Sequence, residues 1–216
     1  MVGQSASGRP VVVAITGGSA TGKSTLARAL GEALVDISPV IVNQDRFFRD
    51  FAELSPEERE QARTANRPDA IFWPAFHAAL DALLAGESTP DPVPGTRAYQ
   101  RNPEQGVLGP GRVVIVEGLF ALWDTRCRVA ADLKVYTEVD DDERVLRRIY
   151  RDITERGGNL EGVISWFRRD VQPNFPIYTQ STRRYADLVV PTDRPVDTAV
   201  RALADAVRAL VDKKGR

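Results

Sequence analysis

The segment GGSATGKST, residues 17–25, limits the folds open to this chain more than any other feature. It follows the apolar run VVVAI, residues 11–15, and leads into LARALGEAL, whose apolar spacing predicts a helix. The glycines, the lysine and the serine fit the P-loop pattern, in which a loop between a strand and a helix holds phosphates. The sequence therefore predicts an α/β protein that binds a nucleotide.

The residue types in this loop suit ATP and Mg²⁺. Glycines allow successive backbone N–H groups to point at phosphate oxygens, and the following helix adds the positive end of its dipole. Lys23 can bridge the β- and γ-phosphates, and the hydroxyl of Ser24 can coordinate Mg²⁺. The ATP-binding residues expected here are Gly17, Gly18, Ser19, Ala20, Thr21, Gly22, Lys23, Ser24 and Thr25.

Short runs rich in branched apolar residues alternate with helical patterns along the whole chain, which favours a parallel sheet covered on both faces. The expected strands are residues 11–15, 40–42, 113–116, 133–137 and 188–190. Helices are expected from residue 23 and over residues 74–85, 140–158 and 195–213. The predicted fold is a three-layer P-loop NTPase fold, with a parallel five-stranded sheet flanked by helices.

The 216 residues, 43% hydrophobic and 27% charged, are enough for one sizeable core, so a single domain is expected over residues 1–216. Residues 1–10 are expected to form a loose tail. Residues 86–111 are rich in Pro and Gly and predict a long surface excursion, which is either a mobile connection or a wall of the site for the acceptor substrate. Residues 144–165 predict a lid.

The charge and the cysteine content narrow the function classes. A net charge of −1 gives no bulk attraction to nucleic acid or to anionic membranes, so neither is expected as a partner. The single cysteine, Cys127, cannot form an internal disulfide, and no signal peptide or long apolar run is evident. We expect a cytoplasmic protein acting on small molecules; the sequence leaves a homo-oligomer open.

Two carboxylates follow predicted strands. Asp45 comes after the second strand and Glu117 ends the third, and parallel sheets bind ligands at this edge. Asp45 can accept a proton from an acceptor hydroxyl, and Glu117 can hold Mg²⁺ or touch the acceptor. The alternatives are a helix-capping or surface aspartate and a solvated glutamate. With Lys23, both are assigned to catalysis, and Glu117 and Ser24 to the metal.

An arginine cluster follows the fourth strand, at Arg144, Arg147, Arg148, Arg151 and Arg156. Acidic residues in DDDER could simply pair with these arginines on a solvated helix. Transfer of a γ-phosphoryl group, however, needs positive charge over the departing oxygens, which an arginine-bearing lid supplies. The paired glycines in TERGGNLEG suit the tip of such a lid.

Taken together, the blocks GGSATGKST, QDRFF, RPDA, VVIVEGLFALWD, RRIYRDITERGGNLEG, VQPNF and RRYADLVVP resemble the uridine kinase and phosphoribulokinase family of P-loop kinases. The resemblance runs from about residue 11 to residue 191. It implies ATP with Mg²⁺ and phosphoryl transfer to a primary hydroxyl of a ribose-like acceptor. By position, Asp45 matches the catalytic aspartate of the family, Glu117 its strand-end glutamate, and Arg151 and Arg156 its ATP-binding lid arginines, Arg151 also being assigned to catalysis.

The resemblance is weaker at the acceptor site. Asn66 stands where pyrimidine nucleoside kinases of the family carry a ribose-binding aspartate, and Trp166 replaces a glutamine that meets the base. Gly158 replaces an arginine, whereas Arg148 retains one that approaches the nucleoside. The expected acceptor-binding residues are Asn66, Tyr99, Arg101, Arg148 and Trp166.

Several interpretations remain open at this stage. Counting back from Glu117 without a gap places Tyr99 at the base-reading histidine and keeps Arg101, which indicates a changed or relaxed acceptor. A shift of a residue or two would let Tyr99 and Arg97 approach a base, as in a uridine kinase proper. Trp166 could also be a core residue. Other classes are an ATP-binding regulatory protein with little turnover and, less favoured by the charge, an ATPase acting on a macromolecule.

Overall fold

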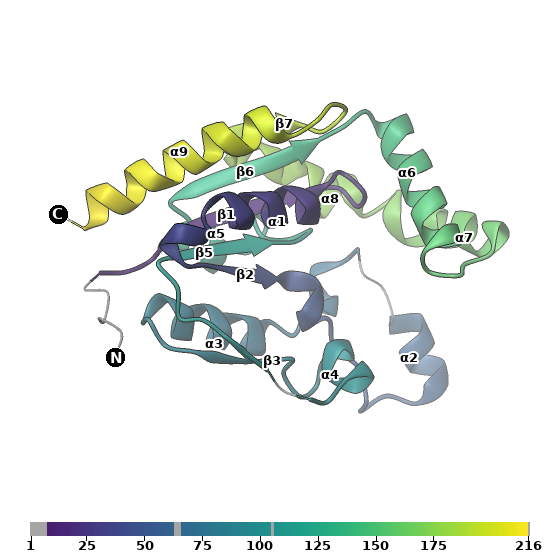
Figure 1. The fold of residues 1–216 in the computed structure, drawn as a ribbon. Coiled ribbons are helices and arrows are strands. Elements are labelled where there is room, and N and C mark those ends of the chain that lie inside the picture. The colour runs from purple at the N-terminus through teal and green to yellow at the C-terminus, as the bar shows by residue number, and fades with distance from the viewer. Residues whose placement is uncertain (1–7, 63–65, 105, 216) are drawn as a thin grey trace.

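The computed structural model describes residues 8–62, 66–104 and 106–215, so residues 1–7 of the expected tail lie outside it. Within these residues, five parallel strands form one sheet in the order β2-β5-β1-β6-β7 (Figure 1). They are β1 (Val11–Gly17), β2 (Pro39–Asn43), β5 (Val113–Glu117), β6 (Leu133–Glu138) and β7 (Leu188–Pro191). The expected strands are confirmed, and each one extends one or two residues beyond its predicted limits.

Helices cover both faces of the sheet, because alternate residues of each strand point to opposite sides. Val13 and Ile15 of β1 belong to the core under α1 (Lys23–Ala33) and α9 (Asp197–Lys214). Val12 and Ala14 belong to the core under α3 (Trp73–Leu84) and α5 (Thr125–Ala130). The run VVVAI is apolar at every position because both faces are buried, and the predicted three-layer fold is confirmed.

The carboxyl ends of β1, β2 and β5 meet at one edge of the sheet. Glu117 is paired in register with Ile15 of β1 and with Asn43 of β2. The residues that follow these strands are therefore brought together, although they lie far apart in sequence. The long α6 (Asp141–Thr154) and the shorter α7 (Leu160–Trp166) extend past this same edge (Figure 1).

The connecting segments contain more regular structure than the sequence predicts. The expected excursion at 86–111 contains β3 (Thr89–Asp91) and β4 (Gly106–Leu108), paired antiparallel, and the helix α4 (Arg97–Arg101). The expected helix at 140–158 is α6 followed by a turn. The remaining elements are α2 (Pro56–Ala62), α8 (Phe175–Tyr178), the 3₁₀ helices η1 (Val35–Ile37), η2 (Gln44–Phe47), η3 (Pro68–Ala70) and η5 (Gln180–Tyr185), and the π-helix η4 (Phe167–Val171).

None of the helices in the described residues is long and apolar enough to cross a lipid bilayer.

Candidate functional site

The loop after β1 packs tightly against the rest of the protein. Gly17 has a φ of 150°, and a side chain there would collide with the hydroxyl of Thr137 on β6. The Thr21 hydroxyl lies 2.6 Å from that of Thr137, and the Thr192 hydroxyl donates to the Thr21 carbonyl at 2.9 Å. These contacts fix the loop between β6 and the end of β7, which gives a ligand a preorganised cradle.

Lys23 begins α1 with its side chain buried under the loop. Its ammonium group donates a hydrogen bond to the carbonyl of Gly18 at 2.9 Å. Burial lowers the pKa of Lys23, and the negative charges of Glu117 and Asp45 oppose this shift. The ammonium group therefore lies at the loop together with two carboxylates, where it can meet phosphate oxygens.

Ser24 and Glu117 place two oxygen atoms side by side. The Ser24 hydroxyl donates to Glu117 Oε1 at 3.0 Å, and the Glu117 side chain is buried. Burial raises the pKa of Glu117, whereas the charge of Lys23 and the hydrogen bond from Ser24 lower it. A hydroxyl and a carboxylate are hard oxygen donors, which suits Mg²⁺ bound through one or two protein groups and the phosphates of a nucleotide. The residues present thus fit MgATP.

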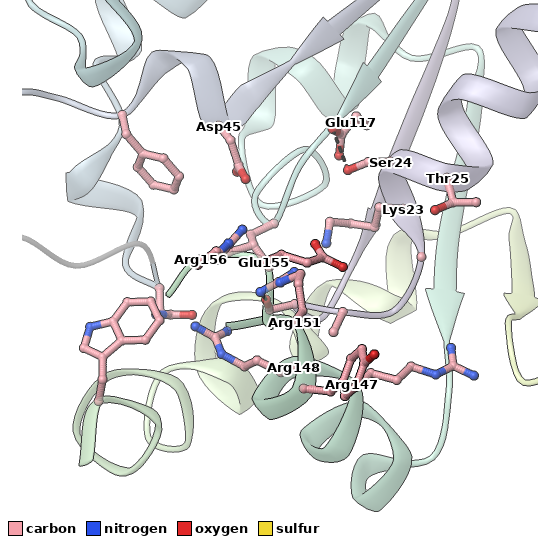
Figure 2. A pocket seen from close by; sticks show the side chains of 18 residues that line it. Lys23, Ser24, Thr25, Asp45, Glu117, Arg147, Arg148, Arg151, Glu155 and Arg156 are labelled. Carbon is pink, nitrogen blue, oxygen red and sulfur yellow. Dashed lines mark hydrogen bonds between the residues drawn. The ribbon is translucent and has the colours of Figure 1, made fainter. Parts of the chain in front are cut away.

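Asp45 lies across the cavity from Lys23 (Figure 2). It occupies the 3₁₀ helix η2 directly after β2, and its backbone N–H donates to the side chain of Asn43 at 2.8 Å. This capping interaction fixes the backbone while the carboxylate of Asp45 stays exposed. Asp45 is thus a solvent-accessible carboxylate at the edge of the sheet where ligands bind.

Four arginines from α6 and the turn that follows it line the cavity, and three of them contact the loop, Trp166 or Asp152 (Figure 2). Arg151 Nη2 donates to the hydroxyl of Ser19 in the loop at 3.3 Å. The guanidinium of Arg148 lies 4.6 Å from the ring of Trp166, and burial lowers the pKa of Arg148 to about 10. Arg156 forms an ion pair with Asp152 at 3.1 Å. These contacts place positive charge next to the loop.

A cavity of about 590 Å³ joins these groups. It is lined by Ser19, Ala20, Gly22, Lys23, Ser24, Thr25, Asp45, Phe48, Asn66, Glu117, Leu119, Arg147, Arg148, Tyr150, Arg151, Glu155, Arg156 and Trp166. Its volume is within the usual range for small-molecule sites.

The segments that form this cavity fall within a region of the chain that matches a known sequence family. Residues 12–199 match the sequence profile of the phosphoribulokinase/uridine kinase family. The chain belongs to this family.

Individual relatives agree with this assignment. The chain is 36% identical to a uridine kinase of Lactiplantibacillus plantarum over 94% of its own length and 97% of the relative. It is 36% identical to a uridine kinase of Brevibacillus brevis over 85% and 86% of the two chains. A solved structure of a putative fructose transport system kinase from Silicibacter superposes with a TM-score of 0.67 at 23% identity, covering 88% of this chain and 93% of that one, which supports the fold.

Membership in the phosphoribulokinase/uridine kinase family confirms the expected phosphotransferase acting on an alcohol group. The structure brings most of the predicted site residues into this cavity. Gly17, Gly18 and Thr21 of the loop do not line the cavity, and Gly17 and Thr21 pack against Thr137 instead, whereas the other predicted loop residues line it. Tyr99 and Arg101 are not among its lining residues, because α4 places both of them elsewhere.

Sequence reasoning assigned no role to four other lining residues, namely Phe48, Leu119, Tyr150 and Glu155. Phe48 follows Asp45 in the block QDRFF, and Leu119 follows Glu117 by two residues. Tyr150 and Glu155 flank the predicted lid arginines. Proximity in sequence to predicted site residues was the available signal for all four.

Proposed function

We propose that this family member is a kinase that transfers the γ-phosphate of MgATP to a primary hydroxyl group of a nucleoside or a ribose-like compound. The observation that supports this most directly is that one cavity contains Asp45 on one side and Lys23 with Glu117 on the other. A base for the acceptor hydroxyl and a site for the donor phosphates are thus provided by the same cavity.

In this proposal the loop amides and Lys23 bind the donor phosphates, and Ser24 and Glu117 bind the metal. MgATP supplies the phosphoryl group, with the metal neutralising charge on the phosphate oxygens. Asp45 orients the acceptor hydroxyl and takes its proton as the oxygen attacks in line. The segment from α6 to α7 acts as the lid, with Arg151 and Arg156 adding positive charge where the phosphoryl group moves.

The acceptor end of the cavity supports a site that differs from that of a strict pyrimidine nucleoside kinase. Trp166 and Phe48 line it with aromatic surface, and Asn66 adds an amide. Tyr99 and Arg101, which the ungapped count places at the base-reading histidine and the arginine of the family segment, do not line it. Although the two relatives described above are named uridine kinases, we propose that selection for uracil is relaxed or redirected in this chain.

The test is acceptor-dependent ADP release from MgATP across uridine, cytidine, purine ribosides, nicotinamide riboside, ribulose 5-phosphate, pantothenate and glycerate. The Asp45→Asn variant should lose on the order of 10²- to 10⁴-fold in kcat with little change in nucleotide affinity. Asp50→Asn is the matched control, because Asp50 lies on the same segment and does not line the cavity.

Turnover of one or more of these alcohols by the wild type, abolished in Asp45→Asn alone, supports the proposal. Efficient turnover confined to uridine and cytidine would contradict the redirected acceptor. A wild-type kcat in Asp45→Asn would show that Asp45 is not the base.

A further inference from the structure

One carboxylate in the lid contacts three arginines. Asp152, on the last turn of α6, is only 6% exposed. Its Oδ1 atom lies 2.9 Å from Arg151 Nη2 and 3.1 Å from Arg156 Nη1, and its Oδ2 atom lies 3.3 Å from Arg148 Nε. Asp152 does not line the cavity, whereas all three arginines do. It therefore contacts the cations without lining the cavity itself.

Local backbone geometry creates this convergence. Arg148 precedes Asp152 by four residues, so both side chains lie on one face of α6. Arg156 lies beyond the end of the helix, in a turn closed by a hydrogen bond of 2.9 Å from the Gly158 N–H to the Asp152 carbonyl. A helix face and the turn after it thus direct cations toward the same carboxylate.

The three arginines also reach both ends of the cavity. Arg151 contacts Ser19 in the phosphate loop at 3.3 Å, and the guanidinium of Arg148 lies over the Trp166 ring at 4.6 Å. Without a counter-ion these like charges would repel one another. Solvent screens this repulsion less where the guanidinium groups are buried than where they are exposed. Arg151 and Arg156 donate charge-assisted hydrogen bonds to Asp152 Oδ1, which are directional as well as attractive and so set where these two guanidinium groups lie. Arg148 is attracted to the same carboxylate through the ion pair at 3.3 Å.

We infer that Asp152 is a positioning residue for phosphoryl transfer, which holds Arg148, Arg151 and Arg156 in the arrangement that the transition state requires. This inference rests on the proposed kinase function. An amide is a poor substitute, because asparagine carries no charge and its NH₂ group, placed at the Oδ2 position, would face the Nε donor of Arg148. Asp152 thus acts through the arginines and does not touch the substrates.

The expected signature is a separation of binding from catalysis. Removing the negative charge of Asp152 has two opposing effects on nucleotide affinity in the ground state. The arginines attract phosphates more strongly, but they are held less firmly in place, so the affinity changes little. The transition state gains no such compensation, because it depends on exact placement of charge around the moving phosphoryl group. Asp152→Asn should therefore lower kcat far more than it weakens nucleotide binding.

The experiment compares the wild type with Asp152→Asn, Asp152→Glu and the control Asp142→Asn. Asp142 is an exposed acid on the first turn of the same helix. Asp152→Asn should lower kcat by roughly tenfold to hundredfold, the range produced by small misplacements of reacting groups. The dissociation constants of MgADP and of a magnesium complex of a non-hydrolysable ATP analogue should change by less than about threefold. Asp152→Glu should recover part of kcat, and Asp142→Asn should match the wild type.

A second measurement requires no turnover. In protein labelled with ¹⁵N-arginine, the Nε–H signal of Arg151, which donates to Asp152 Oδ1 at 3.1 Å, should exchange slowly with water in the wild type, and a lysine variant assigns this signal. It should exchange faster in Asp152→Asn and stay unchanged in Asp142→Asn. This result decides whether Asp152 holds the arginines even if no acceptor is found, an outcome that would count against the proposed function alone.

Three results would overturn the inference. One is an unchanged arginine spectrum in Asp152→Asn. Another is a kcat within about twofold of the wild type in a variant whose arginine signals have changed. The third is loss of nucleotide binding in parallel with kcat, since this would show that the carboxylate only maintains the folded lid.

Discussion

The Ser24 hydroxyl donates a hydrogen bond to Glu117 Oε1 at 3.0 Å, joining the first turn of α1 to the last residue of β5. Pairing of Ile15 with Glu117 in the sheet sets this contact, because it brings the end of β5 level with the strand that enters the phosphate loop. Two oxygen donors are thereby placed at the loop by the sheet register. Burial of the Glu117 carboxylate also costs folding free energy.

The first prediction concerns the dependence on metal. Glu117→Gln retains an oxygen to accept the Ser24 hydrogen bond but removes the negative charge. The concentration of Mg²⁺ that gives half-maximal activity should rise by roughly tenfold to hundredfold, the usual effect of weakening the support of a metal site. A titration with Mg²⁺ at fixed nucleotide concentration measures this, with exposed Glu161→Gln on α7 as control. An unchanged titration curve would exclude Glu117 from the metal site.

The second prediction uses the same variant to test stability against pH. The pKa of Glu117 is raised in the folded protein, with burial as the leading cause. A raised carboxyl pKa means that its stability contribution is complete below the ordinary glutamate pKa of about 4.3 and is lost as pH rises through the raised value. Glutamine mimics the protonated form at every pH.

Glu117→Gln should therefore unfold at a higher temperature than the wild type at pH 7.5, and this difference should shrink toward pH 4.5. Thermal unfolding without nucleotide or metal, at several pH values, measures it. A difference that is constant with pH would mean that Glu117 titrates normally. In the expected case, Glu117→Gln is more stable than the wild type at pH 7.5 but less active, which is the trade-off between stability and activity known from functional sites.

The sequence predicted the sheet and much of the site because those features depend on local patterns. The P-loop motif and the all-apolar β1 determine where Lys23 and Ser24 lie. Glu117 was placed correctly at the end of a strand by position alone. Regular structure within 86–111 was missed, since β3 and β4 are three residues each and their Pro and Gly content is typical of loops.

Long-range features of the site were less accessible from sequence. The placement of Tyr99 depended on an alignment through a variable segment, and only the fold shows that α4 lies outside the cavity lining. The role inferred for Asp152 depends on its burial and on a turn beyond α6, and the sequence alone does not distinguish it from the other acidic residues near these arginines. Helical spacing could not predict its contact with Arg156, because Arg156 lies outside the helix.

A third prediction concerns the acceptor end of the cavity. Trp166→Ala removes the ring that covers the guanidinium of Arg148. The KM of the acceptor should rise by roughly threefold to thirtyfold, in line with the energy of a partly desolvated cation–π contact and the lost aromatic surface. The KM of MgATP should stay nearly constant, because the loop is untouched. Trp123→Ala is the matched control, since Trp123 packs on Trp73 away from the cavity.

Steady-state kinetics with each substrate varied in turn distinguishes the two KM values. If Trp166→Ala raised both KM values equally, Trp166 would be a packing residue of the lid with no preference for the acceptor. Trp166→Phe should fall between the wild type and the alanine variant because it keeps a smaller ring over Arg148.

The fourth prediction concerns the turn that holds Arg156. A Cβ atom at Gly158 would lie 2.9 Å from the Asp152 carbonyl oxygen and 2.9 Å from Val163 Cγ2, closer than such atoms approach. Gly158→Ala must therefore displace the turn, and it should lower stability by about 1–3 kcal/mol, typical of overpacking. Because the displaced turn carries Arg156 away from Asp152, kcat should fall as well.

Thermal unfolding and kcat should be compared with those of Gly157→Asn. Gly157 has a φ of 70° and open space around its Cβ position, and asparagine tolerates this left-handed conformation. If Gly158→Ala behaved like this control, the turn would be loose and the Asp152 cluster could not depend on it. If Gly158→Ala loses stability and kcat as expected, an arginine at position 158, the residue that the family resemblance implies there, would require a different turn.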